Sequence, residues 1–538
     1  MPSFFKKSKQ KQQEQTRPKN QMKLGLYSSL KDNIELIKKE TGNSPDITVR
    51  TLNIDVEPKK EIVIVYVGGI VDEESINKFI VSPIMENQDR FDGPPQDLFN
   101  LLTGHGVTLG DLNLVSNWDD FFQSLMDGRT LLLIDGESKA LVANTKGGEQ
   151  RSIEQPESEV SVRGPKDGFT ESIQTNLALV RRRIRNPDLW VESMKIGKRT
   201  KTDVSIMYLN DVVNPAIVEE VRHRLNEIQI DSILESGYIE QLIEDQTWTI
   251  FPTIYHTERP DVIAGNILEG RVAIFIDGTP FVLLAPAVFI QFFQSVEDYY
   301  ARFDIASALR FLRILTFFLS IMAPSAYIAA TTFHQEMIPT QLVLIIAAQR
   351  ETVPFPAFVE AVLMEITFEI LREAGVRMPR AVGSAISIVG ALVIGQAAVQ
   401  AGIVSPAMVI IVSITAIANF ATPSFAMAIS ARLIRFLFMG TAAIFGFYGV
   451  ILGIIMLTVH LCSLRSFGVP YMSPLAPLSL GNLGDTLIRT PLWATREKAN
   501  LIMNERENLH GAHMPRPKPP INREMITRNN KKGDKNES

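Results

Sequence analysis

The sequence has a single cysteine, Cys462, in 538 residues. This excludes an intramolecular disulfide and any metal site that needs several cysteine ligands. The N-terminal residues, MPSFFKKSKQKQQEQ, contain no apolar stretch of the kind found in a cleavable signal peptide. We therefore expect the N-terminal half of the chain to stay in the cytoplasm.

Charged residues are absent from two long stretches of the C-terminal half. Residues 381–431 and residues 436–464 contain no Asp, Glu, Lys or Arg, although 21% of the whole chain is charged. A soluble domain rarely buries charge-free runs of that length, whereas a helix that crosses a bilayer needs about 20 apolar residues. The sequence therefore excludes a wholly soluble protein, and it also excludes a disordered one.

Basic residues are concentrated at the two ends of the chain. Residues 1–24 carry seven Lys/Arg and one Glu, and residues 496–538 carry ten Lys/Arg and six Asp/Glu. We interpret residues 1–24 and 481–538 as basic, disordered tails. Such tails either attract anionic lipid headgroups or remain solvated, and the composition leaves both interpretations open.

The N-terminal half contains an internal repeat. EIVIVYV begins at Glu61 and the related DVSIMYL at Asp203, whereas GRTLLLIDG begins at Gly128 and GRVAIFIDG at Gly270. Both pairs have the same offset of 142 residues (203 − 61 and 270 − 128). The repeat predicts two related subdomains, roughly residues 25–160 and 165–285.

Each copy of the repeat predicts helices and strands in the same order. Asp-Gly lies between two apolar runs in both copies, at 135–136 and 277–278, which predicts a β-hairpin. The predicted helices are 27–39, 73–80 and one that begins near 117 in the first copy, and 169–185, 216–228 and one that begins near 259 in the second. The predicted fold class is mixed: two related α/β cytoplasmic subdomains followed by an α-helical polytopic membrane domain.

The N-terminal half shows no catalytic constellation. It contains no Gly-rich phosphate loop, Walker lysine or nucleophile elbow. The pair His510 and His513 has metal-ligand spacing, but we interpret it as accidental. We therefore expect no enzyme, no cofactor, no metal site and no nucleic-acid partner. The arginine cluster 181–185 favours equally a site for phosphate or lipid headgroups and the solvated face of a helix.

Residues 286–480 are predicted to form the membrane domain. The four stretches long and apolar enough to span a bilayer are 311–333, 384–404, 406–430 and 436–461. An amphipathic helix over 355–373 is expected to lie at the interface or to pack against the bundle. The distribution of arginines favours additional crossings, one of them near 466–480, where three prolines make a helix poor. We predict four to six spans.

Polar residues inside the predicted span 384–404 indicate a function. Gln396 and Gln400 lie on one face of that helix, with Val399 beside them. They favour either a pore wall with Val399 as its apolar constriction, or hydrogen bonds to a neighbouring helix, with Asn419 as a partner. The predicted spans lack a charge at mid-membrane, which argues against a secondary transporter.

Several long motifs resemble the GerA family, the A subunits of bacterial spore germination receptors. RGPKDGFTE, beginning at Arg163, and TERPD, ending at Asp261, are similar to signatures of this family, as are VPFP at 353–356, MEITFEILRE at 364–373, IGQAAVQ at 394–400 and SFGVPY at 466–471. The resemblance covers about residues 45–495. Its signature residues in this chain are Arg163, Gly164, Pro165, Glu258, Arg259, Pro260 and Asp261.

The resemblance implies a receptor subunit in the inner spore membrane with its N-terminal domain in the cytoplasm. It implies a permease-like B subunit, a lipoprotein C subunit and membrane lipid as partners, and a homo-oligomer that releases monovalent cations. On this chain, Gln396, Val399 and Gln400 become the candidate pore or gate residues. Glu365 and Glu369 are the rival gate candidates, and their structural alternative is ion pairing with Arg372 and its neighbours. A membrane-anchored signalling scaffold without its own pore is the alternative function.

Overall fold

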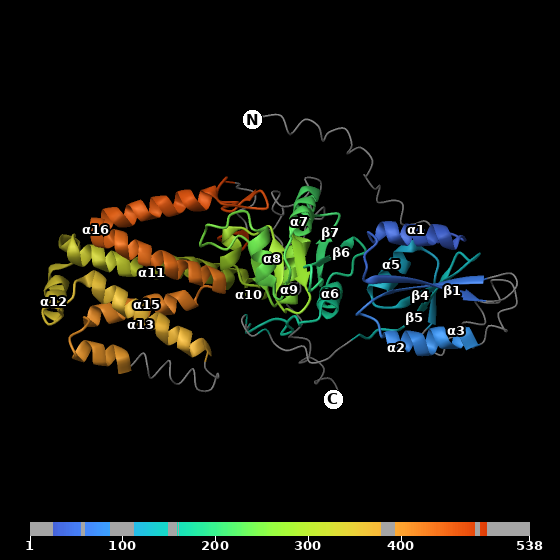
Figure 1. The fold of residues 1–538 in the computed structure, drawn as a ribbon, viewed down its shortest axis with the longest axis horizontal. Helices are drawn as coiled ribbons and strands as arrows, with labels where there is room; N and C mark the ends of the chain where they lie inside the picture. Colours follow the sequence, from blue (N-terminus) through green and yellow to red (C-terminus); the bar gives the residue numbers. More distant parts are fainter. Residues whose placement is uncertain are drawn as a thin grey trace, which may run out of the picture.

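The chain was analysed in a computed structural model, which describes residues 25–54, 60–86, 112–148, 156, 159, 161–377, 393–478 and 485–491. Two α/β units are followed by a helical bundle (Figure 1). The predicted N-terminal tail, most of the predicted C-terminal tail and the pair His510 and His513 lie outside the described residues.

The first α/β unit is built on a five-stranded antiparallel sheet with the order β1-β2-β4-β5-β3. Its strands are β1 (Ile47–Ile54), β2 (Lys60–Val67), β3 (Leu112–Val115), β4 (Thr130–Ile134) and β5 (Ala140–Ala143). Its helices are α1 (Leu30–Glu40), α2 (Glu73–Ile76), a π-helical turn (Asn77–Val81), α3 (Ser82–Glu86) and α5 (Trp118–Met126). The predicted Asp-Gly hairpin is confirmed, because β4 and β5 pair antiparallel across it.

The second α/β unit repeats this topology, with the sheet order β6-β7-β9-β10-β8. Its strands are β6 (Leu189–Ile196), β7 (Thr202–Leu209), β8 (Tyr255–Thr257), β9 (Val272–Ile276) and β10 (Val282–Ala285). Its helices are α6 (Ile173–Arg181), α7 (Pro215–Glu227), α8 (Ser236–Ile243) and α9 (Pro260–Leu268). Strand β7 begins 142 residues after β2 (202 − 60), which is the spacing of the sequence repeat. The domain boundaries 25–160 and 165–285 stay a prediction.

Helices cover both faces of the second sheet because β7 is apolar on both sides. Val204 and Ile206 belong to the core shared with α7 and α8, whereas Met207 and Leu209 belong to the core shared with α6 and α9. Helix α7 begins after the N-cap Asn214, with proline in its first turn, as such helices commonly do. Its buried face consists of Ile217, Val218, Val221 and Leu225, which lie at helical spacing.

The C-terminal half is helical. Its helices are α10 (Glu297–Tyr300), α11 (Phe303–Thr332), α12 (Thr340–Arg350), α13 (Ala357–Arg377), a helical segment 393–400, α15 (Pro406–Phe420) and α16 (Phe425–Ser463). Among the described residues, α11 and α16 are long and apolar enough to cross a membrane. After α16 the chain forms the short strands β11 (Arg465–Ser466) and β12 (Val469–Pro470).

Helix α16 is a hairpin with its tip at Gly446. This glycine has φ +59° and ψ −142°, which is not helical. A Cβ on Gly449 would lie 2.2 Å from the Thr441 carbonyl oxygen, and one on Gly453 would lie 3.1 Å from the Phe438 ring. Residues eight apart in a straight helix are about 12 Å apart, so these contacts require the chain to fold back. The two arms are seen as separate helices in Figure 1.

The structure corrects three crossings that were expected from the sequence. The predicted span 436–461 is wrong as a single crossing because the chain reverses at Gly446. The predicted span 406–430 is interrupted between Phe420 and Phe425, where α15 ends and α16 begins. The crossing considered near 466–480 is not helical in the described residues, since strands and turns replace it as far as 478.

Helix α13 turns part of its apolar surface outward and buries two of its carboxylates. Ile366 and Ile370 are 47% and 64% exposed, whereas Glu360 and Glu365 are 0% and 1% exposed. A helix at a water interface would have the opposite arrangement. The predicted amphipathic helix 355–373 therefore packs against the bundle with its polar face, which is the arrangement expected of a helix surrounded by lipid.

Candidate functional site at the junction of sheet and bundle

The residues of the family signatures meet around one arginine. Arg259 lies at the N-cap position of α9, and its guanidinium donates to both carboxylate oxygens of Asp261 at 3.1 and 2.7 Å. It also donates to the Ser161 hydroxyl at 2.9 Å and to the Pro165 carbonyl at 3.0 Å. Its side chain is 4% exposed. Through these buried hydrogen bonds, Arg259 fixes the segment between the two sheets onto α9.

Tyr300 of α10 joins the same cluster. Its hydroxyl donates to Asp261 at 2.8 Å. Its ring lies so close to Gly164 that a Cβ at that position, where φ is +133°, would approach it to 2.5 Å. Burial and the hydrogen bond to Asp261 raise the pKa of Tyr300 to about 12. The signatures at 163–165 and 258–261 are thus parts of one structural joint, which connects the second sheet to the start of the helical bundle.

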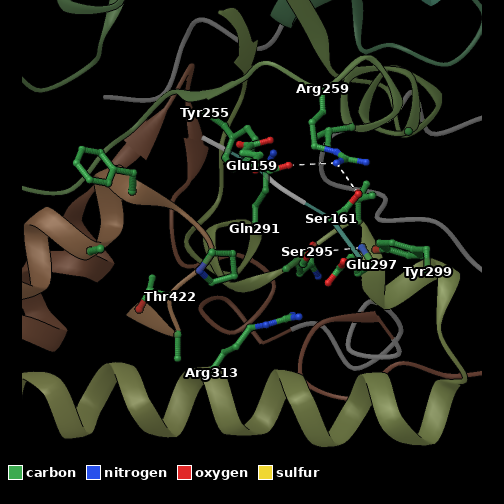
Figure 2. A pocket seen from close by; sticks show the side chains of 18 of the residues that line it. Glu159, Ser161, Tyr255, Arg259, Gln291, Ser295, Glu297, Tyr299, Arg313 and Thr422 are labelled. Atoms are coloured by element: carbon green, nitrogen blue, oxygen red, sulfur yellow. Dashed lines mark hydrogen bonds between the residues drawn. The ribbon is translucent and has the colours of Figure 1, made fainter. Parts of the chain in front are cut away.

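A cavity of about 650 Å³ lies beside this joint (Figure 2). One wall comes from the second α/β unit and the segments around it, and the other from α11, α13, α15 and α16. Its charged or polar lining includes Glu159, Arg259, Asp261, Asn266, Arg271, Gln291, Arg313, Arg372, Asn419, Thr422 and Arg432. The cavity therefore separates the sheet unit from the end of the bundle that faces it.

Several buried polar atoms of this cavity have no partner among the described residues. They are Gln291 Oε1, Asn419 Oδ1, Thr422 Oγ1 and Arg271 Nε. Gln291, Asn419 and Thr422 are 5%, 8% and 7% exposed. Leaving such atoms unpaired costs about 1–3 kcal/mol each, so a cavity that collects them is suited to a polar ligand.

The acidic residue at the sheet side of the cavity is protonated more easily than usual. Burial raises the pKa of Glu159 to about 7, although the Thr257 hydroxyl donates to its carboxylate at 2.6 Å and lowers the pKa. Nearby, burial lowers the pKa of His256, but the interaction with Glu240 outweighs it and raises the pKa above the ordinary value. Glu159 therefore changes charge near neutral pH.

The arginine cluster 181–185 has neither of the two roles expected for it. Arg181 is 1% exposed and donates to Asp46 of the first unit at 2.7 and 3.1 Å. Arg182 donates to the carbonyl oxygens of Gly69 and Gly147 at 3.3 and 3.0 Å. Arg185 pairs with Asp127 of the first unit at 2.8 Å, so three of the four guanidinium groups of the cluster hold the two α/β units together.

The glutamines of the predicted pore wall are exposed. Gln396 and Gln400 lie on the outer side of the helical segment 393–400, whereas Val399 packs partly against the bundle core. Asn419 Oδ1 accepts no hydrogen bond from the described residues, so a bond to it from either glutamine is not formed. Residues 378–392, which include the start of the predicted span 384–404, lie outside the described residues.

The rival gate residues form ion pairs. Glu365 pairs with Arg435 of α16, and the Thr415 hydroxyl donates to the same carboxylate at 3.2 Å. Glu369 lies between Arg372 and Arg432, and its distance to Arg432 is 3.3 Å. Glu369 pairs with Arg372, as the structural alternative expected, whereas the partner of Glu365 is Arg435 of α16. Glu365 and Arg435 lie outside the four spans predicted from the sequence, and their pair is buried within the bundle.

Sequence reasoning missed the polar lining of the cavity. Gln291, Thr422 and Arg432 come from three separate segments, and none of them belongs to a motif with a known spacing. Arg432 could have been found from the sequence, because it is a charged residue between the two charge-free runs. Gln291 and Thr422 are distinguished only by their burial in the folded chain, and this cannot be read from the sequence.

Comparisons with known proteins agree on one family. A family profile described as Bacillus/Clostridium GerA spore germination protein matches residues 35–501. Spore germination protein KA of Bacillus subtilis (strain 168) is 56% identical over 525 residues, 98% of this chain and 95% of that protein. Spore germination protein B1 of the same strain is 40% identical over 469 residues, 87% of this chain and 95% of that protein. The crystal structure of the N-terminal domain of the A subunit of the Bacillus megaterium spore germinant receptor GerK3 is similar with a TM-score of 0.41 and 50% identity, covering 50% of this chain and 99% of that one.

Proposed function

Because the chain belongs to the GerA family of spore germination proteins, the A subunits of germinant receptors, we propose that it forms a homo-oligomeric channel that releases monovalent cations when a nutrient germinant is sensed. Its partners in this proposal are a permease-like B subunit and a lipoprotein C subunit. The receptor lies in the inner spore membrane, with the two α/β units in the cytoplasm.

The exposed glutamines carry this proposal. Gln396 and Gln400 lie in a charge-free stretch, yet they are directed away from their own bundle. An amide exposed to hydrocarbon loses its hydrogen bonds to water, so such residues are expected to meet water or another chain. A ring of copies that directs these glutamines to a common axis satisfies them with pore water.

The contacts of the bundle support an even number of crossings. Ser430 of the first arm of α16 and His460 of the second arm both contact residues 249–250 of the sheet unit. The tip at Gly446 lies beside His334, at the far end of α11. With α11, α13, the span 384–404 predicted from the sequence, α15 and the two arms of α16 as crossings, the proposal has six spans and a cytoplasmic C-terminus. It agrees with the upper limit of the sequence prediction.

In this proposal the junction transmits the germinant signal. The signature joint around Arg259 connects the α/β units to α10 and α11, and the cavity beside it borders α13 and α15. A partner subunit would move the two α/β units. This movement would shift these helices and widen the pore at the level of Val399. Val399 stays the candidate constriction, with Gln396 and Gln400 on the pore wall.

The proposal is tested with the purified full chain in nanodiscs and liposomes. We expect a particle of four or more copies, and cation flux that Val399→Ala increases and Gln400→Leu decreases. Ser413→Ala on α15 is the matched control, because its exposed hydroxyl bonds only to the Val409 carbonyl at 2.7 Å in its own helix. A stable monomer in several lipids, or flux that Gln400→Leu leaves unchanged, would contradict the channel.

A signalling scaffold within the receptor is the second candidate function. It is favoured by the buried joint around Arg259, which couples two folded parts without requiring a pore. In that case substitutions at Gln396 and Gln400 would be silent in germination, whereas substitutions in the joint would abolish it.

A further inference from the structure

The cavity at the junction is a site at which a second molecule completes the structure. We propose that it binds the phosphodiester headgroup of an anionic, hydroxyl-bearing lipid such as phosphatidylglycerol. The inference rests on the proposed placement of the bundle in a membrane, but it concerns a ligand that the channel proposal does not need.

Positive charge on the bundle wall favours an anion on that side, because the carboxylates that line the cavity, Glu159, Asp261, Glu269 and Glu297, lie outside the bundle wall. Arg372 and Arg432 both line the cavity and share one carboxylate, that of Glu369. Two guanidinium groups against one carboxylate leave one positive charge uncompensated in this trio. Arginine donors present the fork geometry that suits phosphate, and basic pockets between helices at the cytoplasmic side of a membrane bind lipid headgroups.

Unpaired polar atoms lie around the same space. The side chains of Thr422, Gln291 and Asn419 line the cavity, and each has a covered polar atom without a partner among the described residues. The Thr422 hydroxyl can donate to a phosphate oxygen once its side chain turns toward the cavity, and Gln291 Oε1 and Asn419 Oδ1 are acceptors. A bare phosphate diester has no proton to give to the two amide oxygens. A headgroup with hydroxyl groups supplies both a negative charge and hydrogen-bond donors. It can therefore bind the arginines and also donate to the two amide oxygens.

Apolar side chains at the bundle end suit the acyl chains of the lipid. Phe420 and Phe425 line the cavity and are 71% and 65% exposed. From them, exposed apolar residues continue along α15 and α16, including Ile417 at 70% and Leu437 at 61%. A lipid with its phosphate near Arg432 can therefore place its chains along these helices in the surrounding hydrocarbon.

The test measures lipid retention by native mass spectrometry of the full chain, released from micelles that contain equal amounts of phosphatidylglycerol and phosphatidylcholine. We expect preferential retention of phosphatidylglycerol, reduced about fivefold by Arg432→Gln, since one arginine near anionic lipid contributes about 1 kcal/mol. Arg432→Lys should restore part of it. The matched control is Arg377→Gln on α13, whose side chain is 78% exposed and lies outside the cavity. Equal retention of both lipids, or equal loss in the Arg377 variant, would overturn the site.

Hydrogen exchange distinguishes lipid from free phosphate and controls for misfolding. In phosphatidylcholine nanodiscs, added phosphatidylglycerol should slow exchange in residues 419–423, and Thr422→Val should reduce that protection while exchange in the two sheets stays unchanged. Equal protection by inorganic phosphate without phosphatidylglycerol would overturn the lipid assignment. Because neither measurement uses ion flux, a chain that retains lipid but conducts no ions would contradict the channel proposal alone.

Discussion

Glu365 of α13 and Arg435 of α16 form an ion pair in the interior of the helical bundle, where their side chains are 1% and 2% exposed. Arg435 also donates from Nε to the Ser320 carbonyl of α11 at 2.6 Å. One charged pair therefore joins three helices. The free energy of such a pair depends on both partners being present, because a single charge left in a dry interior is costly.

Removing one partner of this pair should destabilise the bundle strongly. Glu365→Gln leaves Arg435 uncompensated, and we expect the free energy of unfolding to fall by about 3–5 kcal/mol. Unfolding of the detergent-solubilised chain by a denaturing detergent measures this. The control is Arg377→Gln, which breaks the exposed pair with Glu373 and should cost less than about 1 kcal/mol. Similar losses in the two variants would show that the interior pair contributes nothing special.

The tip of the α16 hairpin should depend on glycine. Gly446→Ala forces a side chain into φ +59° and ψ −142°, and its Cβ would meet the His334 ring at 2.7 Å. The backbone conformation alone costs about 1–3 kcal/mol. Gly440→Ala in the same helix is the control, because nothing lies within 4 Å of its Cβ, and it should stabilise the helix by up to about 1 kcal/mol. Cysteine cross-linking between the two arms, at positions other than their glycines, measures whether the hairpin is kept. If Gly446→Ala is tolerated as well as Gly440→Ala, this would argue against a reversal of the chain at Gly446.

Stability should fall as pH rises through 7 because of Glu159. Its pKa of about 7 in the folded chain exceeds the ordinary glutamate pKa of 4.5, so the folded chain binds more protons than the unfolded chain between these values. The contribution is fully present below about pH 4.5 and is lost as pH approaches and passes 7. Glu159→Gln should flatten this part of the thermal stability profile. His256 changes in the same direction, so His256→Gln is the companion variant that separates the two contributions. An unchanged profile in the Glu159 variant would show that this carboxylate is not desolvated in the folded chain.

The α/β units were largely predictable from local patterns, whereas the bundle was not. Asp-Gly at 135–136 and 277–278 predicts the hairpins because few other residues favour that turn. Strands β1 and β6 were not predicted, because polar residues such as Arg50 and Glu192 interrupt their apolar residues and each strand pairs with only one neighbour at the sheet edge.

The direction of α13 shows why the bundle was harder to predict. Its periodicity reveals an apolar face and a polar face. Which of the two packs against the protein depends on whether water or lipid surrounds the helix, and in lipid the polar face turns inward. The reversal at Gly446 was hidden for a related reason, because glycine within an apolar run is common in membrane helices and only its φ distinguishes a turn. The cavity requires residues from several distant segments, so no local window of the sequence contains it.

Replacing Arg259 by lysine should release the segment that joins the two sheets. The guanidinium binds Asp261 through two atoms while it reaches Ser161 and the Pro165 carbonyl, and a lysine ammonium cannot make these bonds at once. We expect faster hydrogen exchange in residues 161–165 and around Tyr300, with the core strands β7 and β9 unchanged. Arg199→Lys is the control, because Arg199 is 83% exposed and its contact with Asp231 at 3.9 Å is weak. If the Arg259 variant leaves exchange in 161–165 unaltered but blocks germination, the arginine acts on a partner rather than on the joint. If it accelerates exchange and also blocks germination, the joint itself carries the signal from the α/β units to the helices.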